Sequence, residues 1–293
     1  QRGKPISTHR MIRGDFRRPG EIVRAGFPAI ANHSGIHPKR GERRELAAWI
    51  TRADNALALR VAANRIWLQH FGQPLATPED FGTQGRPPTH PALLDWLATE
   101  LPRRKWSLKA MHRIIVTSST YRQSSLVKNQ TVTTVDPMND LWWRYEQRRL
   151  DAEAIRDSVL AVSGRLNPEL YGLPIFPPLP GDIAETVKYS ENKWDTQLDH
   201  AGRKRSIYIY QQRTLNMPFM QAFDSTVCDE SRPRRRTSVT PLQALSLFNG
   251  DFVNEEADAL ARRIRREAGE GKGEQVRLAY RLAFSRSPNP EEA

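Results

Sequence analysis

Three side chains suited to proton transfer lie within one stretch of the chain, residues 60–98. His70 comes before a segment rich in proline and glycine, and His90 and Asp95 follow it. If that segment folds back as an elbow, the three side chains meet in a polar cleft. Histidine titrates near neutral pH, so such a cleft would suit acid/base chemistry on a carbohydrate. The alternative is structural: Asn64 and Arg65 satisfy loop carbonyls, and His90 only begins a helix.

The densest basic cluster of the chain comes immediately before Thr240-Pro241, a pair that predicts a helix start. Guanidinium groups beside the N–H donors of a helix start suit a sulfate, a phosphate or a carboxylate. We therefore take the cluster as the candidate site for an anionic ligand. The alternatives are a solvated loop and docking onto an acidic neighbouring domain. The members of this arginine cluster are Arg232, Arg234, Arg235 and Arg236.

A third charged group falls within one predicted helix, residues 151–163. Its segment RRLDAEAIRD places Glu153 one helical turn before Arg156 and Asp157. Side chains three or four residues apart on a helix are neighbours, which leaves two interpretations open. The first is a network of ion pairs that ties the helix to its surroundings. The second is a pair of carboxylates, one of which raises the pKa of the other.

Metal and thiol chemistry are only weakly indicated. His33 and His37 have the spacing of a helical metal pair, but Gly35 and Pro38 oppose a helix there. The single cysteine, Cys228, stands beside two acidic residues that raise a thiol pKa, so we expect it to be inert. The sequence therefore predicts no metal site and no cofactor in this chain. It also lacks a Walker loop, a dinucleotide fingerprint, G-x-S-x-G and H-E-x-x-H.

The composition indicates a basic protein. Its 293 residues carry 45 Lys and Arg against 33 Asp and Glu, a formal net charge of +12. That charge favours nucleic acid, an anionic polysaccharide or an acidic protein surface as a partner. Nucleic acid is disfavoured because no DNA- or RNA-binding motif accompanies the charge. No stretch approaches the roughly 18 apolar residues of a membrane span.

Hydrophobic periodicity predicts a mostly α fold with long loops rich in proline and glycine and at most a small β element. Helix starts are indicated by cap residues such as Ser107 and Thr240, and helix ends by glycines such as Gly72. The best strand candidate is Ser206–Tyr210, with the sequence SIYIY. The predicted helices cover residues 43–51, 56–71, 91–101, 108–115, 151–163, 217–223, 241–249, 252–268 and 274–284, with Asp251 as the cap of the helix at 252–268.

The expected organisation is an extended lead-in followed by one helical domain. Residues 1–40 contain recurrent glycine and proline without a sustained period, and they form the lead-in. Residues 41–293 form the helical domain. Within it we expect lobes at 41–165 and 200–293, joined by a proline-rich loop at 166–199. The chain begins and ends in mid-sequence, so we expect it to be part of a longer protein.

Many separate motifs occur in one fixed order along most of the chain. They are NRIWLQHFG, ATPEDFG, PPTHPALLDWLA, WSLKAMHRIIVTSSTYRQSS, DPMNDLWWR, RRLDAEAIRDSVLAVSGRL, RSIYIYQQR, FDS and RRRTSVTPLQALSLFNGDFV. Together, over about residues 41–265, they resemble the planctomycete domain of unknown function 1553 family. The lead-in IRGDFRRPGE also looks like the segment that joins this domain to a second one in such proteins.

The resemblance implies a cellular location and neighbouring domains for this protein, and it does not imply a particular reaction. In that family the domain typically sits at the C-terminal end of large exported proteins, many of which carry a cytochrome-c-like domain. It therefore implies a periplasmic or cell-surface location and a haem on a neighbouring domain. The leading hypothesis is an accessory or substrate-binding domain that engages an anionic glycan or an acidic partner domain. The alternatives are a carbohydrate-active enzyme built on the His/Asp cleft and, disfavoured, a nucleic-acid-binding module.

Overall fold

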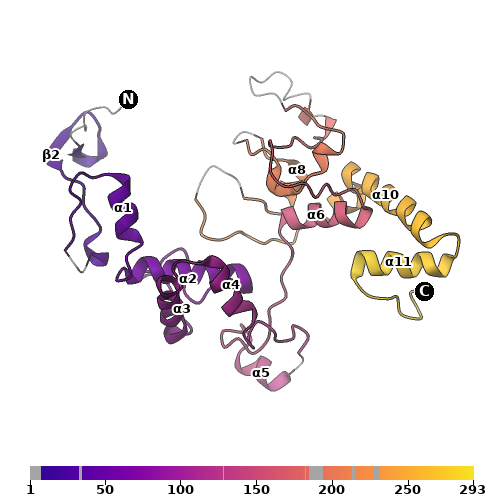
Figure 1. The fold of residues 1–293 in the computed structure, drawn as a ribbon, viewed down its shortest axis with the longest axis horizontal. Coiled ribbons are helices and arrows are strands. Elements are labelled where there is room, and N and C mark those ends of the chain that lie inside the picture. The colour runs from indigo at the N-terminus through magenta and orange to yellow at the C-terminus, as the bar shows by residue number, and fades with distance from the viewer. Residues whose placement is uncertain are drawn as a thin grey trace. The chain divides into compact units, whose positions relative to one another are not determined.

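The chain forms two compact units, residues 1–148 and 149–293, called unit 1 and unit 2 below (Figure 1). The structure is a computed structural model that describes residues 8–32, 35–127, 129–181, 183–184, 194–212, 215–226 and 231–293. Each unit has its own hydrophobic core. The subdivision into a lead-in and two lobes stays a prediction.

Helix boundaries in unit 1 follow local capping signals. The Asn55 side chain accepts a hydrogen bond from Ala58 N, Ser107 accepts one from Ala110 N, and Gly72 ends its helix in the left-handed conformation. The described elements are β1 (Thr8–Met11), η1 (Ile12–Gly14), β2 (Pro19–Val23), η2 (Ala29–Ala31), α1 (Arg43–Ile50), α2 (Ala56–Phe71), α3 (Pro91–Arg103), α4 (Leu108–Val116) and α5 (Gln130–Val135).

Unit 1 is organised around α2, which packs against both α3 and α4. Its core includes an aromatic group in which Trp67 stacks on Phe71, with ring centroids 4.1 Å apart. Trp142 meets Trp67 edge to face at 5.2 Å and is buried, so this tryptophan belongs to the core. The neighbouring Trp143 donates its indole N–H to the carbonyl of Asp136.

The loop after α2 is held by one buried side chain, Asn64. Its Oδ1 accepts hydrogen bonds from Leu75 N at 2.8 Å and Ala76 N at 3.0 Å, and its Nδ2 donates to the Ala76 carbonyl at 2.8 Å. All three groups are buried backbone atoms that would otherwise lack a partner. The structural interpretation of Asn64 is therefore confirmed for this residue.

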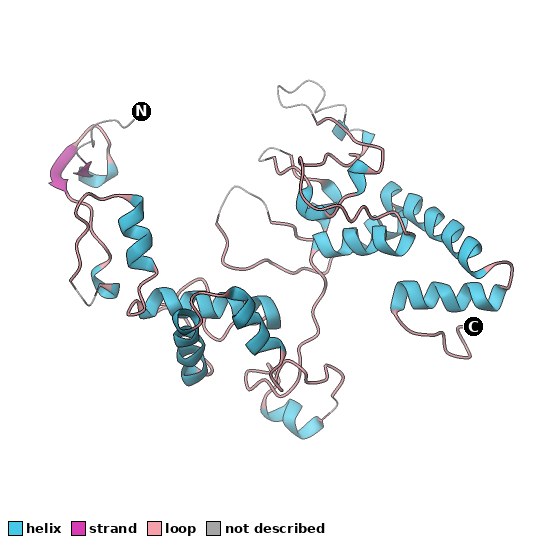
Figure 2. Ribbon diagram, in the orientation of Figure 1, coloured by secondary structure: helices cyan, strands magenta, loops and turns pink. Residues whose placement is uncertain are grey.

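The lead-in contains the only sheet found among the described residues. β1 pairs antiparallel with β2, with Thr8 opposite Val23 and His9 opposite Ile22 (Figure 2). The expectation of an extended, irregular lead-in misses this hairpin. The segment has no alternating apolar pattern because both faces are largely exposed, and without a buried face there is no periodic signal.

Unit 2 is organised around α6, which packs against α8, η4 and α10. Asp151 precedes α6, and Gly164 ends it in the left-handed conformation, as predicted. The described elements are α6 (Ala152–Ser163), η3 (Ala201–Arg203), η4 (Ser206–Tyr208), α8 (Pro218–Ala222), α9 (Pro241–Asn249), α10 (Asp251–Ala268) and α11 (Lys272–Phe284). The core beneath α6 is formed by Ala152, Ile175, Ile209, Met217, Met220 and Phe223.

The predicted strand at Ser206–Tyr210 is wrong. Ser206–Tyr208 forms the 3-10 helix η4, and only Ile209 makes an isolated parallel bridge, to Ile175. Asp157 on α6 accepts hydrogen bonds from both the backbone N–H and the hydroxyl of Ser206. These bonds turn the segment where it meets α6, so the tertiary contact overrides the short alternating pattern.

The mostly α class with a small β element is confirmed, because helices dominate both units and strands pair only in the hairpin of the described residues (Figure 2). No helix within the described part of the chain combines the length and the apolarity that crossing a membrane requires.

Candidate functional site

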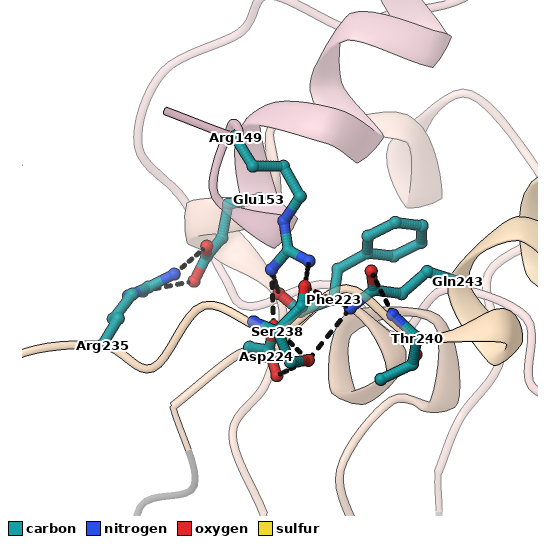
Figure 3. Close-up of polar contacts among 8 residues, drawn as sticks. All are labelled: Arg149, Glu153, Phe223, Asp224, Arg235, Ser238, Thr240 and Gln243. Carbon is teal, nitrogen blue, oxygen red and sulfur yellow. Dashed lines mark hydrogen bonds and ion pairs between the residues drawn. The ribbon is translucent and has the colours of Figure 1, made fainter. Parts of the chain in front are cut away.

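A carboxylate on the first turn of α6, Glu153, faces one member of the arginine cluster, Arg235. Glu153 forms a two-pronged ion pair with Arg235: Arg235 Nη2 donates to Oε1 at 2.7 Å, and Nη1 donates to Oε2 (Figure 3). This hydrogen bonding lowers the pKa of Glu153 and raises the pKa of Arg235. One member of the cluster is therefore already paired with an acid of the same unit.

A second polar network lies beside this pair and fixes the loop that carries the arginine cluster. Arg149 Nη2 donates to Asp224 Oδ2 at 2.6 Å, and its Nη1 donates to the Ser238 carbonyl. Ser238 also donates its backbone N–H and its hydroxyl to Asp224, each at 2.8 Å (Figure 3). The loop after the cluster is thus tied to Arg149, which lies upstream of α6, and to Asp224, which lies just after α8.

The same network reaches the start of α9. The Thr240 backbone N–H donates to the Gln243 side chain in a capping box, and Gln243 Nε2 donates to the Ser238 carbonyl at 3.1 Å (Figure 3). Burial would raise the pKa of Asp224, but the hydrogen bonds from Arg149 and Ser238 outweigh burial and lower it. Asp224 is therefore an ionised anchor that holds the helix start in place.

The third carboxylate of this region, Asp157, holds η4 against α6. Its Oδ1 accepts from the Ser206 backbone N–H and hydroxyl, each at 2.7 Å, and its Oδ2 lies 3.5 Å from Arg205 Nε. Glu153 and Asp157 are one turn apart on α6, yet each has its own arginine. The ion-pair interpretation of this helix fits these contacts.

The two ion pairs, Glu153 with Arg235 and Asp157 with Arg205, line a cavity of about 500 Å³, which we call the carboxylate cavity. Tyr210 lines it with 41% of its surface exposed, and its ring packs at 5.1 Å on Phe176. A cavity of this size with a few convergent polar groups is typical of a small-molecule or oligosaccharide site. Among the described residues, the charged lining consists of three carboxylates and two guanidinium groups: Asp151, Glu153, Asp157, Arg205 and Arg235.

The remaining members of the arginine cluster lie at the surface. Arg232, Arg234 and Arg236 are exposed, and Arg232 and Arg234 have interaction partners. Arg235 is therefore the member that the structure brings to the carboxylate cavity. Cys228, which precedes the cluster, lies outside the described residues, as does His33.

The His/Asp group of unit 1 makes three separate sets of contacts. His70 Nε2 lies 2.8 Å from His112 Nδ1, Asp95 pairs with Arg60 at 2.6 Å, and the His90 ring bonds the Thr89 hydroxyl. No hydrogen bond or ion pair among the described residues joins His70, His90 and Asp95 to one another. Their convergence in a catalytic cleft stays a prediction.

Metal ligands do not gather in the described ranges, where no group of three or more His, Cys, Asp or Glu side chains could hold an ion. The His70 and His112 rings form a pair, and burial together with the nearby charges of His112 and Arg148 lowers the pKa of His70. The lowered pKa favours the neutral form of His70 at pH 7.

Sequence reasoning missed several residues that shape the site. Asp224, Ser238 and Tyr210 were not singled out as site residues, although each stands within a motif shared with the resembled family, whereas Arg149 belongs to the charged segment RRLDAEAIRD that the sequence indicates. The available signal was the fixed order of RRLDAEAIRD, RSIYIYQQR, FDS and RRRTSVTP. Only the fold shows that these four motifs meet around one cavity and its supporting network.

The fold and the cavity define a mostly helical, two-unit protein with a polar cavity in its second unit. The chain belongs to the PSD1 family, described as Protein of unknown function (DUF1553), whose family model matches residues 42–293. No curated protein and no solved structure matches the chain.

Proposed function

We propose that this protein is a saccharide-binding domain whose carboxylate cavity engages an anionic glycan. One observation carries the proposal: a single cavity joins an exposed tyrosine ring with carboxylates, guanidinium groups and the amide of Asn216. A sugar ring presents an apolar face of C–H groups and an edge of hydroxyls. An aromatic ring packs well against the C–H face, and charged hydrogen-bonding groups bind the hydroxyls.

The charge pattern supports two separate roles: the cavity contacts sugar hydroxyls, and the arginine cluster contacts acidic substituents of the glycan. Arg205 and Arg235 line the cavity with carboxylate partners, so the interior favours sugar hydroxyls over a free anion. The exposed Arg236 follows Arg235 on the same loop and is available to an acidic substituent. The proposed ligand is therefore a glycan with sulfate or carboxylate groups along an otherwise hydroxylated chain.

The experiment is calorimetric titration with three oligosaccharides of equal length, one neutral, one uronic and one sulfated, at several salt concentrations. We expect selective binding of an acidic glycan that survives physiological salt. Uniform binding of both acidic glycans that vanishes with salt would mean that the net charge of +12 acts without a site.

The matched variants are Tyr210→Ala and Tyr171→Ala. Tyr210 lines the cavity, whereas Tyr171 is 81% exposed and does not line it. Loss of the stacking surface should weaken glycan binding by about tenfold in Tyr210→Ala. The Tyr171→Ala protein should bind as the parent does. Equal affinities for both variants would contradict a saccharide site in this cavity.

A third variant, Glu153→Gln, should change glycan binding while leaving the stability of the fold nearly unchanged. Its ion pair with Arg235 is partly exposed, so its loss should change the free energy of unfolding by only about 1 kcal/mol or less. The change releases Arg235 and should shift the glycan preference further toward acidic chains. An unchanged glycan preference would show that Arg235 does not contact the anionic groups of the ligand.

The proposed setting is an exported protein, often linked to a cytochrome-c-like domain that would carry any haem. The support for this setting is the resemblance of the ordered motifs. The reading frame upstream of this chain tests it directly: a secretion signal followed by a C-x-x-C-H motif would support it, and their absence from the complete frame would overturn it.

A further inference from the structure

Unit 2 contains a second cavity, of about 630 Å³, whose walls are mostly apolar. It lies between α6 and the segment Pro177–Gly181 and also contacts the starts of α8 and α10. We call it the proline cavity. Its apolar lining includes Leu160, Pro177, Pro178, Leu179, Phe219 and Phe252.

The polar feature of the proline cavity is Arg156, a guanidinium that is only 2% exposed. Its Nη1 donates to the Lys204 carbonyl at 3.1 Å and the Ser206 hydroxyl at 3.2 Å, and its Nη2 donates to the Gly202 carbonyl at 3.0 Å. Among the described residues, no hydrogen-bond acceptor pairs with its buried Nε–H. A guanidinium has five N–H donors, so Nε–H and one Nη2–H remain for another acceptor.

The charge of Arg156 is not matched by a carboxylate. Asp157 and Glu256 act on it electrostatically, but within the described residues no acid lies within 4.0 Å of its nitrogens. Burial lowers the pKa of Arg156 to about 10, so the side chain keeps its charge at pH 7. A buried charge with spare donors and no counterion is costly unless a ligand or partner compensates it.

Two of the three acids that line the same cavity in the described part of the chain, Glu255 and Glu256, differ from Arg156 in this respect, and the third, Asp251, is exposed to solvent at the start of α10. Glu255 pairs with Arg165 and Arg203, and Glu256 pairs with Arg165 and accepts from the Ser163 hydroxyl. Their charges are therefore compensated within unit 2. The uncompensated charge at the inner wall of the cavity is positive.

We propose that the proline cavity binds a small carboxylic acid with an apolar body, whose carboxylate is received by Arg156. The planar guanidinium matches a carboxylate through two parallel N–H donors, and the apolar body replaces water against leucine, proline and phenylalanine side chains. The volume lies within the range of ligand sites in proteins. The inference is independent of the glycan proposal, because Glu153, Asp157 and Tyr210 do not line this cavity.

The test is titration of the whole chain with octanoate and with octan-1-ol, a neutral molecule of nearly the same shape. We expect octanoate to bind about tenfold more tightly than octanol, since only the anion pairs with the guanidinium. In Arg156→Gln the two ligands should bind equally. Equal binding of octanoate and octanol by the parent protein, or no binding of either, would overturn the proposal.

A second pair of variants keeps the test valid should Arg156→Gln fail to fold. Ser246 on α9 lines the cavity, whereas Ala244 on the same helix is exposed and does not line it. Ser246→Trp should fill the space and remove octanoate binding, and Ala244→Trp should leave it unchanged. Octanoate binding that survives in Ser246→Trp would place the site elsewhere and also overturn the proposal. Glycan titration of the same variants should give parent affinities.

Discussion

At the scale of single residues, Asp224 determines how the arginine-bearing loop meets α6. It accepts hydrogen bonds from Arg149 and from two groups of Ser238, and its backbone has φ of 61°, in the left-handed region. Few non-glycine residues adopt that conformation, and aspartate is among those that do so most readily. The side-chain contacts thus anchor a residue whose backbone has an uncommon conformation.

Asp224→Asn should lower the free energy of unfolding by about 1–3 kcal/mol, because the hydrogen bond between charged partners is lost in a partly buried place. The folded state lowers the pKa of Asp224, so its contribution is present above the unfolded pKa and is lost as pH falls through the folded pKa. Urea unfolding between pH 7 and pH 3 measures both effects.

The parent should lose more stability than Asp224→Asn over that pH range. The control is Asp258→Asn, in which the carboxylate is 80% exposed and pairs weakly with Arg262 on the same helix. This variant should unfold as the parent does at every pH. A pH dependence identical in the parent and Asp224→Asn would show that this carboxylate is not the anchor we describe.

At the scale of elements, Asn64 holds α2 and the loop after it together. It belongs to α2, and its side chain forms hydrogen bonds with the backbone of Leu75 and Ala76 in the loop. Asn64→Ala would leave the N–H groups of Leu75 and Ala76 and the Ala76 carbonyl buried without partners. The free energy of unfolding should fall by roughly 3 kcal/mol or more. Thermal and urea unfolding measure the change, and Arg65→Ala, at an exposed neighbouring position, should have little effect. Similar free energies of unfolding for Asn64→Ala and Arg65→Ala would show that Asn64 does not hold this loop in place.

The end of α2 gives a second test at this scale. Gly72 has φ of 76°, and a Cβ added there would lie 3.1 Å from Arg148 Cδ. Gly72→Ala should therefore destabilise the protein by about 1–2 kcal/mol, the cost of a left-handed alanine. Gly26→Ala is the control, since a Cβ at Gly26 has nothing within 4 Å. Comparable melting temperatures for the two variants would show that the helix end tolerates a side chain.

Element ends were predictable from sequence because capping acts over three or four residues. Ser107, Gly72 and Gly164 are identifiable from residue type and position alone, and each acts as predicted; of the two candidates Asp54 and Asn55 for the cap of α2, the structure selects Asn55. The strand expected at Ser206–Tyr210 was not predictable in this way. Its conformation depends on Asp157, which is 49 residues away from Ser206 in sequence.

At the scale of the whole molecule, the two units have separate cores and each is compact. We expect residues 149–293, expressed alone, to fold with a helical circular dichroism spectrum and a cooperative thermal transition. Both cavities lie within this unit, so the fragment should also bind the glycan and octanoate with the affinities of the full chain. A fragment without a cooperative transition would show that unit 2 needs unit 1 to fold.

The helical class, most of the helix ends, the family and the positions of the charged clusters follow from the amino-acid sequence, because each of these is encoded over a few neighbouring residues or in the order of motifs. The pairing of Arg235 with Glu153, the contact of Asp224 with Ser238 and the burial of Arg156 beside an apolar cavity arise only in the folded chain. These contacts join residues far apart along the chain. Their partners are chosen by packing and burial, which no local pattern specifies.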